Sequence, residues 1–227
     1  AMADAREQAS ELVASADALA IATGMLSPGR LDAMLWAAEA ARARMRPWVL
    51  APEGAELTAT GRRAAAALLA RGPTVLAGSP AEIHILSGVL PRPHGEPFTD
   101  APDTTIPAEV EAAARQVALR FGTVVAVGGD AGLVTDGDRV VRLGALEGTL
   151  RQVAGEPTAL SATVAAFLAI HHDAYEAAAT ALGFFALAAG RAGGGLRVAG
   201  PGSFAVALVD ALAAIDGGAL DRLALPG

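Results

Sequence analysis

The sequence contains no cysteine and few aromatic residues. Without cysteine the chain forms no disulfide, has no thiolate nucleophile and offers no cysteine ligand to zinc. Aromatic residues make up 4% of the 227 residues and hydrophobic residues 53%, so the core has to consist mainly of alanine, leucine and valine. Because alanine-rich helices pack closely against a sheet, this composition favours a layered α/β fold. It also suits a reducing cytoplasm.

Long apolar runs and clustered positive charges are also missing. The mean hydropathy is +0.42, but the longest apolar stretch, from Ala159 to Ile170, has about a dozen residues, whereas a bilayer requires roughly 20. The first residues include acids and no apolar segment typical of a signal peptide. The net charge is −7 and the arginines are scattered, which argues against a nucleic-acid surface. We therefore expect a soluble, cytoplasmic protein that contacts neither membrane nor nucleic acid.

Strand and helix signals alternate along the chain. Short apolar segments predict strands at 18–23, 48–50, 74–76 and 123–127. Helices are predicted between them from the Ser27-Pro28 start to about 44, at 62–70 and near 83–86. A tight turn at 135–138 predicts an antiparallel hairpin at the edge of the sheet, and the chain after Gly155 reads as helical, at about 157–170, 173–189 and 202–215. The alternation predicts one domain over residues 1–227, with a mainly parallel sheet between two layers of helices.

Ligands of such sheets bind at the carboxyl ends of the strands. We therefore expect the turns after Leu50, Leu76 and Val127, together with the segment before the helix at 157, to line any site. The segment 88–107 is rich in proline, glycine and aspartate and is predicted to be a mobile loop.

The histidines give little sign of catalysis or metal binding. His171 and His172 follow an apolar helix, where the helix dipole favours imidazolium, and we interpret them as a surface cap. His84 and His94 have no carboxylate or second histidine at metal-ligand spacing. The chain also has no G-x-S-x-G, Walker or G-x-G-x-x-G motif.

Several segments occur in a characteristic order. They read ATGMLSP, PWVLAP, GSPAEI, FGTVVAVGGD, GLVTDGDRVVRLG, VAGEPTALSATVAAFLA and GPGSFAVALVDAL. Together they resemble hydroxyethylthiazole kinases of the ribokinase-like superfamily, over nearly the whole chain except the 88–107 segment. The resemblance implies a three-layer α/β/α fold that transfers the γ-phosphoryl group of ATP to the hydroxyethyl side chain of a thiazole in thiamine biosynthesis. It further implies Mg²⁺, a homotrimer, and a first strand and helix ahead of the position that matches Ala1.

The family's catalytic loop is only partly matched. It reads T-G-x-G followed by a cysteine, or by an aspartate elsewhere in the superfamily, and its glycines let backbone N–H groups face the transferring phosphoryl group. In this chain Gly155 is kept and is implied to contact the substrate, but Pro157 has no N–H. Thr158 replaces the proton acceptor. Glu156 is either a substitute base or an ordinary acid of a helix's first turn, where it suits the dipole.

Other family positions are changed as well. The ATP-contacting arginine and threonine of the family match Ala77 and Gly128, and the resemblance assigns both positions to nucleotide binding although their side chains are lost. By the same resemblance Glu82 and Asp130 are the Mg²⁺ ligands. Glu82 has an alternative interpretation as an exposed acid of a helix's first turn. Met2 matches a methionine that contacts the thiazole, and its alternative is a mobile chain end.

Two functional hypotheses of different class remain. The resemblance favours a kinase of hydroxyethylthiazole, or of another small alcohol, whose nucleotide site has changed. The altered loop favours a catalytically impaired family member that binds a ligand or a partner. Loss of one oxyanion-type donor slows an enzyme by about 100- to 1,000-fold, so the two hypotheses differ mainly in the rate they predict.

Overall fold

The computed structural model contains one sheet of six strands. It describes residues 5–88, 106–129, 131–145, 150, 152–153, 155–194 and 200–220. The strands are β1 (Leu19–Ala22), β2 (Trp48–Ala51), β3 (Val75–Gly78), β4 (Val124–Val127), β5 (Ala131–Thr135) and β6 (Val140–Ala145). They lie side by side in chain order.

The pairing of the strands confirms the predicted sheet. β1 to β4 are parallel, with Ile21 beside Leu50 and Leu76 beside Val125. β5 and β6 form the predicted antiparallel hairpin, and β5 joins it to β4. The chain from β1 to β4 repeats a strand and a crossover helix, and this connection makes neighbouring strands parallel.

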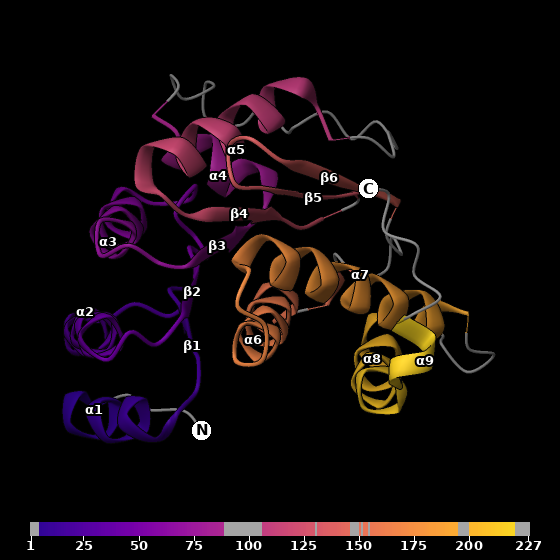
Figure 1. Cartoon of the computed structure of the whole chain (residues 1–227), viewed down its shortest axis with the longest axis horizontal. Helices are drawn as coiled ribbons and strands as arrows, with labels where there is room; N and C mark the ends of the chain where they lie inside the picture. Colours follow the sequence, from indigo (N-terminus) through magenta and orange to yellow (C-terminus); the bar gives the residue numbers. More distant parts are fainter. Residues whose placement is uncertain are drawn as a thin grey trace.

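Helices cover both faces of the sheet, as the alternation predicted (Figure 1). One face carries α1 (Arg6–Ser15), α2 (Pro28–Ala43), α3 (Ala59–Leu69), α4 (Pro80–Leu86) and α5 (Ala108–Phe121). The other carries α6 (Glu156–Leu168) and α7 (Ala174–Gly193); α8 (Pro201–Ala214) packs against α7 and is followed by the short α9 (Gly217–Leu220). In the described part of the chain, no helix has the length and apolar character needed to cross a bilayer.

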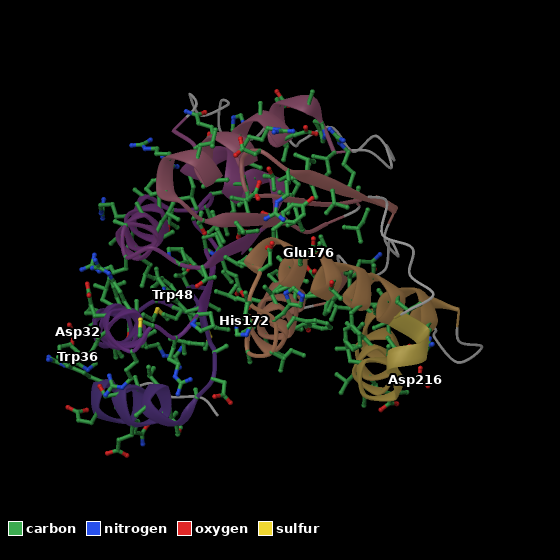
Figure 2. The ribbon with its side chains drawn as sticks, in the orientation of Figure 1. Asp32, Trp36, Trp48, His172, Glu176 and Asp216 are labelled. Carbon is green, nitrogen blue, oxygen red and sulfur yellow. The ribbon has the colours of Figure 1, made fainter. Side chains whose placement is uncertain are left out.

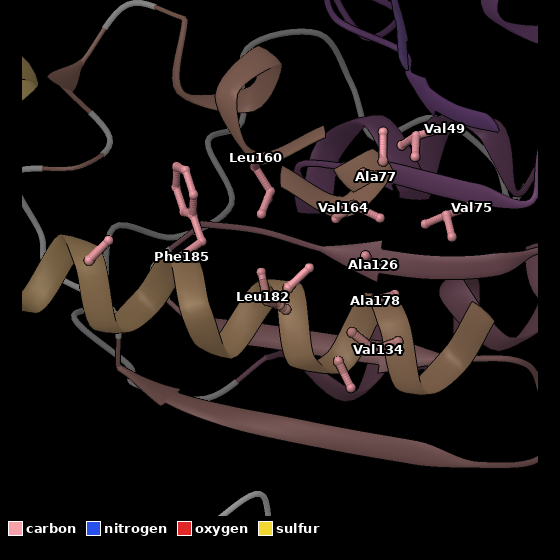
Figure 3. Packing of buried hydrophobic residues seen from close by; sticks show 14 of the residues in the cluster. Val49, Val75, Ala77, Ala126, Val134, Leu160, Val164, Ala178, Leu182 and Phe185 are labelled. Carbon is pink, nitrogen blue, oxygen red and sulfur yellow. The ribbon is translucent and has the colours of Figure 1, made fainter. Parts of the chain in front are cut away.

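The core is divided by the sheet into two apolar clusters. Residues of β2 alternate between them: Val49 packs toward α6 and α7, while Leu50 packs toward α1 to α5. This is the two-residue period of a strand that is buried on both faces. Figure 3 shows the cluster between the sheet and the helices α6 and α7, with Leu182 and Phe185 of α7 among its members. Both side chains are fully buried.

Polar caps begin the helices at the carboxyl edge of the sheet. Ser27, Thr58 and Ser79 each accept a hydrogen bond from a backbone N–H of the first turn of α2, α3 or α4. Pro28 and Pro80 occupy the first helical position, as is usual for proline at a helix start. Several helix N-termini therefore lie at the carboxyl edge, which is the edge where the sequence predicts the site.

Element boundaries differ from the predicted ones by a few residues. α3 begins at Ala59 rather than 62, and α4 begins at Pro80 rather than 83, because the caps Thr58 and Ser79 start a helical turn before the apolar periodicity does. The predicted mobile loop at 88–107 falls almost wholly outside the described residues, as do Met2, His94 and Asp130.

Candidate active site

Glu82 is the most buried carboxylate at the carboxyl edge. It is the third residue of α4 and forms a capping box with Ser79: the Ser79 N–H donates to Glu82 Oε2 at 2.8 Å. The Gly54 N–H, from the loop after β2, donates to Glu82 Oε1 at 3.2 Å. The side chain is 5% exposed, so the interpretation as an exposed first-turn acid is wrong. Glu82 ties the loops after β2 and β3 together.

Burial makes the ionised form of Glu82 unfavourable. Desolvation is the largest cause and raises the pKa of Glu82 from 4.5 to about 7, against the opposing hydrogen bonds from Ser79 and Gly54. The charge of Glu56, on the same loop as Gly54, adds to the rise. A buried carboxylate with a pKa near neutrality is typical of functional sites.

Glu156 is the first residue of α6 and faces the ends of the strands. Its side chain is half-buried, and its Oε1 lies 3.9 Å from the place that a β-carbon on Gly128 would take at the end of β4. Burial, followed by the charges of Glu82 and Glu53, raises the pKa of Glu156 to about 7. Glu156 therefore points into the site rather than into solvent.

The start of α6 offers few donors to an anion. The Glu156 N–H already donates to the carbonyl of Val153 at 3.3 Å, and Pro157 has no N–H. Gly155, the N-cap, is exposed and has a left-handed backbone with φ of 86°, a conformation that glycine adopts without strain. The N-terminus of α6 is thus weaker as an anion site than an ordinary helix N-terminus.

Thr158 is paired with the carboxylate of Glu53, a residue that no sequence motif identifies. Its Oγ1 donates to Glu53 Oε1 at 2.5 Å, across 105 positions of the chain. Glu53 lies on the loop after β2, and the Thr23 hydroxyl donates to its carbonyl at 3.0 Å. Its position after a parallel strand predicts that this loop lines the site, but a contact between two distant segments has no local pattern.

The positions assigned to the nucleotide differ in what they present. Ala77 is 3% exposed and packs in the cluster between the sheet and α6, so its methyl group does not reach a ligand. A β-carbon on Gly128 would lie 3.0 Å from Leu160 Cδ2, which explains a glycine here: the first turns of α6 approach the end of β4 closely.

The described part of the site fits a Mg²⁺ ion better than it fits a metal held by protein ligands alone. Within the ranges that the structure describes, no group of three or more His, Cys, Asp or Glu residues is placed to hold a metal ion. The charge of Glu82 contributes to the raised pKa of Glu156 at the strand ends. Mg²⁺ in kinases is held by one or two carboxylates, with water and phosphate oxygens completing its shell, so Glu82 suits that ion as one hard oxygen ligand.

A cleft of about 530 Å³ opens at the opposite, amino edge of the sheet. His171 and His172 line it together with the start of β2; Figure 2 labels His172 and Trp48 there. Both histidines are exposed and follow the end of α6, as their interpretation as a surface cap requires. They lie at the end of the sheet away from Glu156 and take no part in the candidate site.

A family model and similar known sequences point to the same protein family. Residues 1–217 match the model of the hydroxyethylthiazole kinase family. A hydroxyethylthiazole kinase from Rhizobium etli is 42% identical over 226 residues, which cover 99% of this chain and 84% of that protein. One from Cereibacter sphaeroides is 42% identical over 222 residues, covering 98% of this chain and 82% of the relative.

Solved structures agree with this assignment. The hydroxyethylthiazole kinase protein from Pyrococcus horikoshii superposes with a TM-score of 0.83 at 32% identity, covering 98% of this chain and 81% of that one. A pyridoxal kinase from Bacillus subtilis, at 20% identity and a TM-score of 0.58, shares the fold over 81% of this chain and 68% of its own. The predicted three-layer, ribokinase-like architecture is confirmed, and the chain belongs to the hydroxyethylthiazole kinase family.

Proposed function

We propose that this protein transfers the γ-phosphoryl group of ATP to the hydroxyl of 4-methyl-5-(2-hydroxyethyl)thiazole, a step of thiamine biosynthesis or salvage. The observation that carries the proposal is the match of nearly the whole chain to hydroxyethylthiazole kinases at about 42% identity. The carboxylates and helix N-termini gathered at the carboxyl edge support it, because ligands of this fold class bind at that edge.

The proposed roles follow the family positions that the residues match. Bound MgATP supplies the phosphoryl group, and its metal ion offsets negative charge. Glu82 and Asp130 are the proposed Mg²⁺ ligands, while Gly155 and Met2 contact the acceptor alcohol. At Ala77 and Gly128 only the backbone is left to contact the nucleotide.

Glu156 is proposed to act through its charge. When ionised it stands close to where a transferring phosphoryl group meets the start of α6, and two like charges about 4 Å apart repel by roughly 4 kcal/mol at an effective dielectric near 20. Because its pKa is raised to about 7, the group is partly protonated near neutral pH and the repulsion is reduced. A pKa near neutrality also suits a general base, so direct proton acceptance by Glu156 is the competing role.

Two finer features belong to the same proposal. The family resemblance implies a homotrimer with its sites near subunit interfaces, and a cytoplasmic location. Sedimentation of the purified protein tests the first, and a fluorescent fusion in the native host tests the second.

Phosphorus NMR of the purified protein with MgATP and hydroxyethylthiazole tests the activity directly. We expect a new phosphomonoester signal that grows with time and requires the protein, the thiazole and Mg²⁺. Glu11→Gln, an exposed position on α1, is the control for a change of one charge and should turn over at the wild-type rate. A signal with another small alcohol but not with the thiazole would assign a different acceptor. No product with any alcohol, from a folded protein, would contradict the proposal and leave the ligand-binding alternative.

A further inference from the structure

We infer that Thr158 and Glu53 form a proton relay that takes up the proton of the acceptor alcohol during phosphoryl transfer. The inference rests on the proposed function and deepens it. Thr158 stands where the family has its proton acceptor, and a lone threonine hydroxyl is a very poor base near neutral pH. The structure places a carboxylate directly behind that hydroxyl.

The hydrogen bond between the two side chains has the direction that a relay requires. Thr158 Oγ1 donates its only proton to Glu53 Oε1 at 2.5 Å, a length typical of an O–H donor bound to an ionised carboxylate. A threonine hydroxyl has one proton and two lone pairs. With its proton committed to Glu53, the oxygen is left to accept a hydrogen bond, and an alcohol is the kind of ligand that donates one.

The backbone at Glu53 is held in place from two sides. The Thr23 hydroxyl donates to the backbone carbonyl of Glu53 at 3.0 Å, and the next residue, Gly54, donates its N–H to the buried Glu82. A β-carbon on Gly24 would overlap Glu53 Oε2, so the carboxylate occupies space that only a glycine at position 24 leaves open. The segments that follow β1, β2 and β3 therefore position Glu53 together.

The proton and the phosphoryl group balance in this relay. The hydroxyl oxygen of the acceptor forms a bond to the γ-phosphorus as the bond between that phosphorus and the ADP oxygen breaks. The hydroxyl proton passes to Thr158 Oγ1, and the proton of Thr158 passes to Glu53 Oε1. Because Thr158 is exposed and Glu53 only half-buried, Glu53 then releases its proton to water, and the pair returns to its starting state.

Glu156 is less well placed for the same task. Its Oε1 lies near Gly128, at the end of β4, on the side of the site assigned to the nucleotide. Thr158 lies two residues further along α6, with its hydroxyl directed to the loop after β2. The two acids thus serve different parts of the site: Glu156 acts on the charge near the phosphates, and Glu53 on the proton of the alcohol.

Steady-state kinetics of Thr158→Val and Glu53→Gln test the relay. Each substitution should lower kcat by about 100-fold or more, the usual contribution of general base catalysis, while KM for the thiazole changes by less than about threefold. The double variant should be no slower than the slower single variant, because the two residues act as one unit. Thr163→Val, whose hydroxyl bonds to the Ala159 carbonyl within α6, and Glu11→Gln are the matched controls and should keep the wild-type rate.

A rescue variant separates the relay from a structural role. Thr158→Cys supplies a thiol that ionises on its own at a helix N-terminus, so it should be active with either glutamate or glutamine at position 53. Thermal unfolding without nucleotide gives a second measurement. The changes in midpoint caused by Thr158→Val and Glu53→Gln should not add up in the double variant, since both single changes remove the same hydrogen bond.

The outcomes are distinct for the relay and for the proposed function. An active wild type whose Glu53→Gln variant turns over at the wild-type rate would overturn the relay alone. An inactive wild type beside an active Thr158→Cys variant would show that the site transfers phosphoryl groups but that the relay does not work. An inactive wild type and an inactive Thr158→Cys variant would overturn the proposed function together with the relay.

Discussion

At the carboxyl edge of the sheet, Glu53, Glu82 and Glu156 surround the ends of the parallel strands, whereas the amino edge opens into a cleft of about 530 Å³. The side chains that line this cleft include two arginines and two histidines, Arg42, Arg46, His171 and His172. α2, α3, α4 and α6 begin at the carboxyl edge, where their dipoles favour acids, and α2 and α6 end at the amino edge, where theirs favour bases. The acids of the first edge and the arginines of the second suit these dipoles, although Asp17 and the start of α7 also line the cleft.

Burial distinguishes the two edges. At the carboxyl edge Glu82 is 5% exposed and burial raises its pKa to about 7. At the amino edge the ion pair of Arg46 with Asp17, at 3.6 Å, has side chains that are 40% and 76% exposed. Charges that satisfy a helix dipole in solvent cost little, but charges held in a partly dry site are unfavourable for stability. Proteins keep such charges mainly where they serve function.

The largest loss of stability is expected from the removal of Glu82. Glu82→Ala leaves the N–H groups of Ser79 and Gly54 without their acceptor and breaks the capping box of α4. We expect the free energy of unfolding to fall by about 2 kcal/mol at neutral pH, measured by urea denaturation. Glu39→Ala, in an exposed pair with Arg71, is the control at a helix surface. Equal losses of unfolding free energy at the two positions would show that the buried contacts of Glu82 stabilise the fold no more than an exposed ion pair does.

Raised pKa values at the carboxyl edge give a pH dependence of stability. The folded pKa values of Glu82 and Glu156 are about 7, above their ordinary value of 4.5. Between pH 4.5 and 7 the folded protein holds protons that the unfolded chain has released. The stability that these two protonated groups contribute is therefore fully present below pH 4.5 and is lost as the pH rises through 7. The free energy of unfolding should thus fall over this range.

Glu156→Gln isolates one of the two groups. Above pH 7 it should raise the free energy of unfolding by about 1 to 3 kcal/mol, and near pH 4.5 by almost nothing, because each unit of pKa shift is worth about 1.4 kcal/mol. Denaturation curves at several pH values measure this. A stabilisation that is the same at all pH values would contradict the assignment of the raised pKa to Glu156.

A smaller effect on turnover is expected from Gly24→Ala. The added methyl group would displace the Glu53 carboxylate, which is the flexible end of a side chain, so the fold should survive while the hydrogen bond to Thr158 is lengthened. We expect kcat to fall by about tenfold, which corresponds to about 1.4 kcal/mol. Gly29→Ala, where a β-carbon meets nothing within 4 Å, is the matched control. Equal turnover by the two variants would show that the position of Glu53 is unimportant.

The smallest effect is expected at the amino edge. Arg46→Ala removes an exposed ion pair, and such pairs contribute about 0 to 1 kcal/mol. We expect a change in the free energy of unfolding of less than about 0.5 kcal/mol and unchanged turnover, measured under the conditions used for Glu82→Ala. A loss of activity in Arg46→Ala would place a functional site in the amino-edge cleft and break the contrast between the two edges.

The fold was predictable because its signals are local. The apolar run at 48–50, the Ser27-Pro28 helix start and the turn at 135–138 each specify an element within a few residues, and all three are confirmed. The parallel order of β1 to β4 follows from the helices between them. The predicted start of α4 is wrong because the Ser79 cap and Pro80 begin the helix before its apolar residues do.

The site was predictable only in part, because its contacts join distant segments. The resemblance identified Thr158, and the Ser79-x-x-Glu82 spacing is a readable capping box. Neither shows that Glu82 also binds the Gly54 N–H, or that Thr158 meets Glu53 across 105 positions. The burial that raises the pKa of Glu82 is likewise a property of packed loops, which no short pattern contains.

Phosphoryl transfer to hydroxyethylthiazole by the wild type and by Glu53→Gln, followed side by side by phosphorus NMR, tests the central claim most directly. We predict that the wild type forms the phosphomonoester and that Glu53→Gln forms it about 100-fold more slowly, at a rate unaffected by the further change of Thr158 to valine. Equal rates for the two proteins, or no product from either, would contradict the account that the carboxyl edge is a working kinase site with Glu53 behind Thr158.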